Sequence, residues 1–123
     1  MQDQTLTGKQ EPQRTLERPP IDEALIQEIT RRIVEALHPH RVILFGSRAR
    51  GDARPNSDID LFIEMDSTER PYYRHGSARG ALRGVRASID VIVMTPEEVA
   101  ARRNSLFSLV PIIEREGRVL FQR

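Results

Sequence analysis

The sequence predicts an α/β (α+β) domain in which a small mixed β-sheet is flanked by helices. One long run has apolar residues at helical spacing, three short runs rich in β-branched residues have the length of strands, and clear helix starts follow. The expected order is helix, strand, loop, strand, helix, strand, helix, helix and a short terminal strand. This order is typical of a sheet covered by helices.

The first element follows a polar lead-in. Residues 1–20 contain three prolines and have no apolar period, which predicts a disordered N-terminal segment before a domain over residues 21–123. We expect a helix after Asp22, which can cap the first turn, and His38-Pro39 should end it. Its apolar residues recur at helical spacing: Leu25, Ile26, Ile29, Ile33, Val34 and Leu37.

Two strands and a loop come next. Residues 41–45 are β-branched and aromatic and stop at Gly46, which predicts a buried strand. Glycine, proline and asparagine in residues 46–57 indicate a structured loop, with one helical turn after Ser47. Residues 58–64 alternate carboxylates with apolar side chains, the period-two pattern of a strand with one apolar face.

The second half of the chain predicts helices around one more strand. Residues 70–86 are compatible with a helix, although three glycines weaken the pattern. Residues 88–94 form a strand, and Thr95 with Glu98 forms a capping box that starts the next helix. The remaining elements are an apolar run over 106–113, interrupted at Pro111, and a short strand over 119–121.

Composition excludes several classes of protein. The 123 residues allow one small domain, and the absence of cysteine excludes disulfides and thiolate metal sites. No stretch is long and apolar enough to span a membrane, and the start lacks the pattern of a secretory signal, so we expect a cytoplasmic protein. The net charge of +1 argues against direct binding of nucleic acid.

The carboxylates Asp58 and Asp60 form the first candidate site. On a strand, residues two apart project to the same face, so both side chains should point together while Ile59 and Leu61 face the core. Mg²⁺ is commonly held by one or two carboxylates together with substrate phosphates. An Asp-x-Asp pair also occurs by chance in many chains, so by itself it leaves a surface role open.

A second candidate follows the strand over residues 41–45. Gly46 lets the backbone approach a ligand closely, and the Ser47 hydroxyl with the amides of the next turn could bind phosphate oxygens. Guanidinium groups that can fork onto phosphates are supplied nearby by Arg48, Arg50 and Arg54. No Gly-Lys-Ser or Gly-Lys-Thr follows, so this is not a Walker-type loop.

Asp90 is the third candidate. It lies in an otherwise apolar strand, where a carboxylate is unfavourable unless it is paired or binds a metal. The alternative is an acid near a strand end that bonds a loop amide.

Together these features resemble the nucleotidyltransferase superfamily, which includes DNA polymerase beta, poly(A) polymerases and antibiotic nucleotidyltransferases. A Gly-Ser pair is followed after ten residues by Asp-x-Asp and about thirty residues later by a strand aspartate. The resemblance covers residues 22–121 and is closest to the minimal nucleotidyltransferases. The stretch that carries it reads Phe45-Gly46-Ser47-Arg48-Ala49-Arg50-Gly51-Asp52-Ala53-Arg54-Pro55-Asn56-Ser57-Asp58-Ile59-Asp60-Leu61.

The resemblance implies the nucleotidyltransferase fold and a reaction. Asp58 and Asp60 would bind two Mg²⁺ ions, with Asp90 on the ion nearer the acceptor and able to take its proton. Gly46, Ser47 and Arg50 would bind the nucleotide, the last two through the β- and γ-phosphates. A nucleoside monophosphate, AMP from ATP as the first choice, would pass to a hydroxyl with release of pyrophosphate.

The resemblance also implies a partner. Minimal nucleotidyltransferases resemble the antitoxins of toxin–antitoxin pairs, in which the partner is often a HEPN-type toxin modified on tyrosine (AMPylation). The basic segment over residues 70–86 is a candidate contact surface, with Arg79, Arg83 and Arg86 on one face if it is helical. Two alternatives stay open: an antitoxin that acts by binding alone, and an enzyme that modifies a small molecule such as an aminoglycoside.

Overall fold

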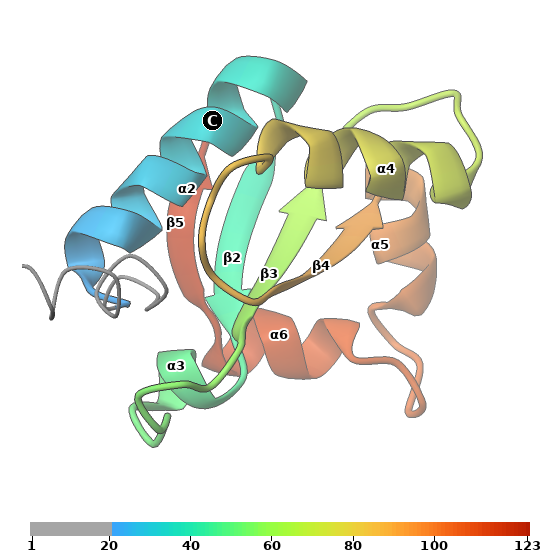
Figure 1. Ribbon diagram of the computed structural model, residues 1–123. Helices are drawn as coiled ribbons and strands as arrows, with labels where there is room; N and C mark the ends of the chain where they lie inside the picture. The colour runs from blue at the N-terminus through green and yellow to red at the C-terminus, as the bar shows by residue number, and fades with distance from the viewer. Residues whose placement is uncertain (1–20) are drawn as a thin grey trace, which may run out of the picture.

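The computed structural model describes residues 21–123, and the expected disordered segment over residues 1–20 lies outside the described residues. The element order agrees with the order expected from the sequence (Figure 1). The elements are α2 (Glu23–Leu37), β2 (Arg41–Phe45), α3 (Ser47–Arg50), β3 (Ile59–Glu64), α4 (Pro71–Ala81), β4 (Ile89–Met94), α5 (Pro96–Arg102), α6 (Val110–Glu116) and β5 (Arg118–Gln122).

The strands form one mixed sheet in the order β4-β3-β2-β5. β2 pairs antiparallel with β3 and with β5, whereas β3 and β4 run parallel. Helices α2 and α4 lie on one face of the sheet, and α5 and α6 lie on the other (Figure 1). The predicted fold class, a small mixed sheet flanked by helices, is therefore confirmed.

The apolar core has two parts, one on each face of the sheet. Under α2 and α4, buried residues of the helices pack on alternate residues of the strands, among them Ile29, Ile33, Ile59 and Leu61. On the other face, Phe62 packs with residues of the sheet and of α5 and α6 (Ile43, Val99, Val110 and Ile113). Side chains of β3 therefore alternate between two buried layers, which fixes its register.

Local signals set the helix ends. The Asp22 carboxylate accepts a hydrogen bond of 3.0 Å from the Leu25 amide, and His38 ends α2 in the left-handed region with a φ of 49°. Thr95 and Glu98 form the reciprocal bonds of the predicted capping box at α5. These interactions pair amide groups that a helix start leaves without partners.

The structure corrects two expectations. Helix α4 ends at Ala81, so Arg83 and Arg86 lie beyond it and cannot share a helical face with Arg79. The chain leaves the helix before Gly84, whose φ of 90° lies in the region that glycine adopts most easily. Pro111 does not interrupt an element but lies in the first turn of α6, where its missing N–H is not needed.

An ion pair joins helices on opposite faces of the sheet next to edge strand β4. Arg74 of α4 is only 3% exposed, and its guanidinium donates bonds of 2.7 Å and 2.8 Å to the two carboxylate oxygens of Glu98 on α5. Arg74 also donates to the Glu69 carbonyl oxygen at 3.3 Å and to the Val93 carbonyl oxygen at 3.4 Å. One arginine of the basic segment over residues 70–86, Arg74, is therefore buried and paired within the fold.

Within the residues that the structure describes, no helix has both the length and the apolar character needed to cross a membrane.

Candidate active site

The starts of β3 and β4 bring two of the predicted carboxylates together. Asp60 and Asp90 are register partners in this parallel pair, so both project from the same face of the sheet. Across the other neighbour, Asp60 pairs with Phe45 at the end of β2. Asp58 lies one residue before β3 and is exposed. The three carboxylates therefore belong to one end of the sheet.

Alternation along β3 directs the Asp60 side chain. Ile59 and Leu61 are fully buried under α2 and α4, so Asp60 between them points to the opposite face. On that face the next residue inward is Phe62, which α5 and α6 cover. The Asp60 carboxylate consequently lies at the edge of an apolar layer and is half-buried.

The charges around Asp60 are not balanced. Burial raises the pKa of Asp60 above its usual value, the negative charges of Asp90 and Asp58 raise it further, and the Arg50 guanidinium opposes the shift. A raised carboxyl pKa means that the ionised form is disfavoured in this environment. The Asp58, Asp60 and Asp90 carboxylates, called here the carboxylate cluster, are therefore close enough to repel one another.

Gly46 lies directly against this cluster. It joins β2 to α3 with a φ of 75°, a conformation that other residues rarely adopt. A Cβ atom at this position would overlap the Oδ2 atom of Asp60. Only glycine therefore allows the backbone before Ser47 to pass this close to the Asp60 carboxylate.

The arginines near Gly46 have different surroundings. Arg48 donates to the carbonyl oxygens of Arg54 at 3.2 Å, of Pro55 at 3.1 Å and of Ser57 at 2.8 Å. Its guanidinium thus holds the loop before Asp58, which corrects the expectation that it binds phosphate. Arg50 is exposed, has only a 3.4 Å contact with Asp52, and is near enough to lower the pKa of Asp60.

Arg79 supports the start of β4, a role that the sequence analysis missed. Its guanidinium, reaching over from α4, donates to the carbonyl oxygen of Ile89, the residue before Asp90. No signal in the sequence indicates this bond, because it depends on how α4 packs over the sheet. It pairs a carbonyl group at the beginning of the edge strand.

The oxygen ligands of the carboxylate cluster suit a hard divalent cation, although their spacing in this structure does not form a ready metal site. Among the described residues, no three acidic or histidine side chains are gathered into a group that could hold a metal ion as they stand. Carboxylate oxygens are nevertheless the ligands that Mg²⁺ prefers. The raised pKa of Asp60 shows that the surroundings leave negative charge which a cation beside it would neutralise.

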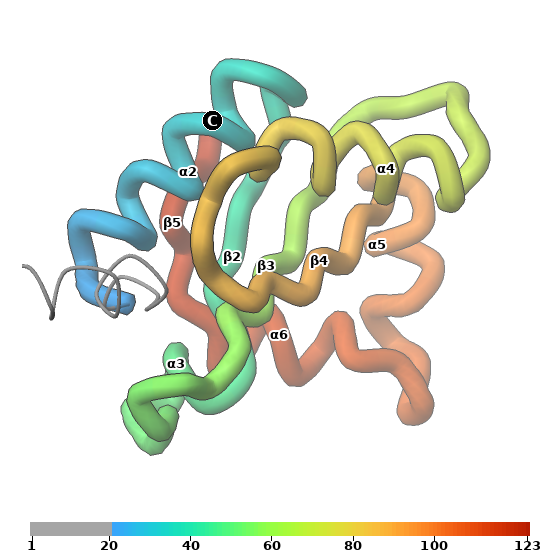
Figure 2. Tube along the Cα trace, viewed as in Figure 1, coloured from blue at the N-terminus to red at the C-terminus, as the bar shows by residue number. Residues whose placement is uncertain are grey.

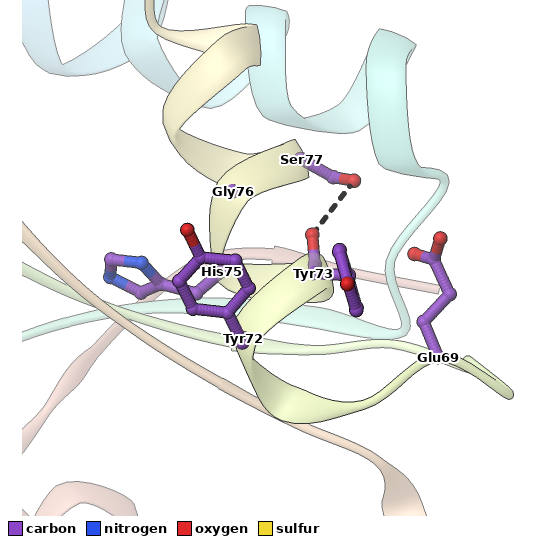
Figure 3. A pocket seen from close by; sticks show the side chains of 6 residues that line it. All are labelled: Glu69, Tyr72, Tyr73, His75, Gly76 and Ser77. Carbon is purple, nitrogen blue, oxygen red and sulfur yellow. Dashed lines mark hydrogen bonds between the residues drawn. The ribbon is translucent and has the colours of Figure 1, made fainter.

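A separate hollow lies on α4. It has a volume of about 490 Å³ and is open to solvent, and Figure 3 shows the side chains around it on the first turns of the helix. The residues that line it are Glu69, Tyr72, Tyr73, His75, Gly76 and Ser77. None of them belongs to the carboxylate cluster, so this hollow is not the predicted site.

Comparisons with known proteins address the family and the fold. A model of the nucleotidyltransferase domain family matches residues 26–119. No curated protein matches the chain.

Two solved structures share the fold. A crystal structure assigned as a nucleotidyltransferase from Sulfolobus solfataricus has a TM-score of 0.58 and 23% identity, covering 81% of this chain and 79% of that one. A toxin–antitoxin structure with AMP-PNP has a TM-score of 0.53 and 21% identity, covering 84% of this chain and 75% of the other.

Proposed function

Because the chain belongs to the nucleotidyltransferase domain family, we propose that it transfers AMP from ATP to a hydroxyl group and releases pyrophosphate. The observation that carries the proposal is the placement of Asp60. Asp60 is the register partner of Asp90 in the parallel pair of strands, and its carboxylate lies against Gly46. Burial and two neighbouring acids raise the pKa of this carboxylate.

The carboxylate cluster would hold Mg²⁺. Asp58 and Asp60 would bind two ions, with Asp90 on the ion nearer the acceptor. Bound there, the metal would neutralise charge on the triphosphate and on the attacking oxygen. Asp58 and Asp90 are exposed, so their oxygens are accessible to a ligand, while the half-buried Asp60 lies between them and the protein interior.

Gly46, Ser47 and Arg50 would position the triphosphate. Gly46 lets this ligand approach the backbone, and the half-buried Ser47 could donate its hydroxyl to a phosphate oxygen. Arg50 is the exposed guanidinium nearest to the cluster by its effect on Asp60, and it can fork onto phosphate oxygens. Arg48 has no such role, because loop carbonyl groups occupy its guanidinium.

The reaction needs positioning rather than a covalent intermediate on the protein. The acceptor oxygen attacks the α-phosphorus of ATP, and the bond from this phosphorus to the β-bridging oxygen breaks, so that pyrophosphate leaves. The acceptor proton passes to Asp90 or to water. Holding the two reactants in line accounts for most of the acceleration in such transfers.

We further propose that the acceptor is a tyrosine hydroxyl of a partner toxin of the HEPN type, so that the chain acts as an antitoxin. The similar toxin–antitoxin structure with AMP-PNP supports the antitoxin role, and the HEPN type and the tyrosine rest on the resemblance of the sequence motif. An antitoxin that acts by binding alone would have no need for the carboxylate cluster, which favours the enzymatic function.

The test uses ATP labelled at the α-phosphate, Mg²⁺ and the protein encoded by the adjacent open reading frame. We expect label on that protein with the wild type and none with the Asp58→Asn/Asp60→Asn variant or with Asp90→Asn. Asp66→Asn is the matched control, because Asp66 is an exposed carboxylate beyond the other end of β3. Full labelling by the double variant would refute the proposal, and label on small molecules alone would favour an aminoglycoside-type acceptor.

A further inference from the structure

Four large apolar side chains are exposed within a short stretch of chain that runs from the α5–α6 connection into the first turn of α6. Leu106 is 94% exposed, Phe107 99%, Leu109 52% and Ile112 43%. These residues are called here the α5–α6 apolar surface. Single exposed apolar residues are common on soluble proteins, but a run of this kind is typical of a surface that another molecule covers.

This surface lies at the same end of the sheet as the carboxylate cluster. β3 and β4 run parallel and carry Asp60 and Asp90 near their first residues. The connection from α5 to α6 reaches the end of the sheet where these strands begin, and α6 then crosses behind it (Figures 1 and 2). A protein bound to the connection would therefore be held beside the proposed site of transfer.

Arginines flank the α5–α6 apolar surface in the chain. No acid occurs between Glu98 and Glu114 in the sequence. Arg102 is exposed and forms neither a hydrogen bond nor an ion pair with its side chain among the described residues. Arg115 is exposed and has only a 3.5 Å contact with Glu116. Both Glu98 oxygens accept bonds from Arg74, which lower the pKa of that carboxyl, and Arg102 is near enough to lower it further. The surface therefore has apolar side chains with an unpaired guanidinium, that of Arg102, close to them in the chain.

The arginine charge distinguishes two candidate partners for the α5–α6 apolar surface, a second copy of this chain and a different protein. In a symmetric dimer the same patch meets itself, so a second copy would bring guanidinium groups of both chains toward one another. Such like charges oppose association, whereas carboxylates on a partner would favour it. The charge thus favours a different protein, with apolar side chains flanked by acids.

We propose that the α5–α6 apolar surface docks the protein acceptor, through a partner surface of apolar side chains flanked by carboxylates. This inference rests on the proposed function and adds the surface that brings the acceptor hydroxyl to the carboxylate cluster. Leu106 and Phe107 are the anchors, because they are the most exposed and would lose the most contact with water on binding.

The chain offers a matched control at the other end of the sheet. Tyr72 and Tyr73 on α4 are 80% and 59% exposed, and their rings meet edge to face with centroids 5.3 Å apart. They follow β3 in the chain and lie beside the hollow shown in Figure 3. Replacing both by serine also removes two exposed apolar side chains, but at a distance from the carboxylate cluster.

The experiment compares wild type, Leu106→Ser/Phe107→Ser, Tyr72→Ser/Tyr73→Ser and Arg102→Glu. The probe is the protein encoded by the adjacent open reading frame. Its Kd is measured by calorimetry, its KM and kcat in the labelled transfer assay, and the Kd for ATP with Mg²⁺ is measured separately. We expect the Leu106/Phe107 variant to raise Kd and KM for the probe about tenfold or more. The kcat and the affinity for ATP should be retained.

The two other variants test the contribution of charge and the location of the docking surface. Arg102→Glu should weaken binding of the probe more at low salt than at high salt, because screening removes a charge effect. The Tyr72/Tyr73 variant should bind like the wild type, within about twofold on the scale of weakly contributing contacts.

Each remaining outcome has a definite meaning. Unchanged binding by the Leu106/Phe107 variant, loss of binding by the tyrosine variant instead, or no binding of the probe by the wild type would overturn the docking proposal. A wild-type dimer in sedimentation that Leu106→Ser/Phe107→Ser abolishes would overturn it in favour of a second copy. Binding without transfer would refute the proposed function alone, and the variants would still test the surface by Kd.

Discussion

The carboxylates near the two ends of β4 have opposite electrostatic surroundings. At the end of β4, Glu98 accepts two bonds from Arg74, and this contact with the guanidinium lowers the pKa of Glu98 to about 2. At the start of β4, burial and the charges of Asp90 and Asp58 raise the pKa of Asp60. The Glu98 carboxylate is paired with a guanidinium within the fold, whereas the ionised form of the Asp60 carboxylate is disfavoured by its surroundings.

The difference distinguishes a carboxylate that stabilises the fold, Glu98, from one that we expect to bind a cation, Asp60. A buried guanidinium with a bidentate partner links α4 to α5 and needs nothing from solution. A cluster of carboxylates with one nearby arginine makes the ionised state unfavourable unless a cation arrives. Functional sites are where such unfavourable ionisation is commonly found. The comparison therefore predicts that changes at the two ends of β4 will have opposite effects on stability.

The largest effect on stability should come from Glu98→Ala. Arg74 is 3% exposed and would lose the one carboxylate partner that it has among residues 21–123. Leaving one charge of a buried pair without its partner destabilises proteins by about 3–5 kcal/mol. Because the Glu98 side chain is 31% exposed, we expect about the lower limit of that range. Urea denaturation measures the free energy of unfolding.

Glu97→Ala is the control for this change. It removes an exposed neighbour in the same first turn of α5. A loss in Glu98→Ala no larger than that of Glu97→Ala would show that the ion pair does not stabilise the fold.

At the carboxylate end, Gly46→Ala should reduce transfer by about 100-fold, because small displacements of reacting groups have effects of that size. The added Cβ would overlap the Asp60 carboxylate, so the backbone or the carboxylate must move. Initial rates of labelled transfer measure the change.

Gly51→Ala separates the overlap from backbone strain. Gly51 also has a positive φ, of 86°, but a Cβ there meets no atom within 4 Å. It should lower stability through strain and leave transfer nearly intact. Equal losses of transfer in both variants would remove Gly46 from the site.

Local patterns in the sequence predicted most of the helices and strands. Apolar period, the Asp22 cap and the Thr95–Glu98 box located the helices, and alternation located the strand that carries Asp60. These signals are local, so each can be interpreted without knowing how the elements pack.

The side-chain contacts that the sequence did not predict all join distant elements or loops. The Arg74–Glu98 pair, the Arg79 bond to the Ile89 carbonyl and the Arg48 bonds to the loop depend on packing. An arginine near a Gly-Ser turn has the same local pattern whether it binds phosphate or a carbonyl group. For this reason the sequence could predict that Asp60 and Asp90 lie close together, but it could not predict which of the nearby arginines is bound to loop carbonyl groups.

A smaller effect, of opposite sign to that of Glu98→Ala, is expected for Asp60→Asn in the absence of metal. Removing a carboxylate whose ionised form is disfavoured by burial and by two neighbouring acids should raise the free energy of unfolding at neutral pH. Thermal melting with and without Mg²⁺ and ATP measures this, with Glu69→Gln as control, because Glu69 is exposed and its side chain has no hydrogen bond or ion pair among the described residues. The wild type should be stabilised by Mg²⁺ and ATP more than the variant. A less stable metal-free Asp60→Asn protein would contradict the electrostatic argument.

The smallest effect should be in the pH dependence of stability, where the two carboxylates have opposite signs. The folded pKa of Glu98, about 2, lies below its usual 4.5, so its contribution is present above pH 4.5 and is lost as the pH falls toward 2. The folded pKa of Asp60 lies above its usual 3.8, so its penalty is absent below pH 3.8 and appears as the pH rises through the folded pKa. The stability of wild type relative to Glu98→Gln should therefore increase with pH, and its stability relative to Asp60→Asn should decrease. Denaturant titrations across the acid range measure both differences, each changing by at most about 1.4 kcal/mol per pH unit, the limit for one proton. Two differences that change in the same direction would mean that the ends of β4 do not differ as the charges around them indicate.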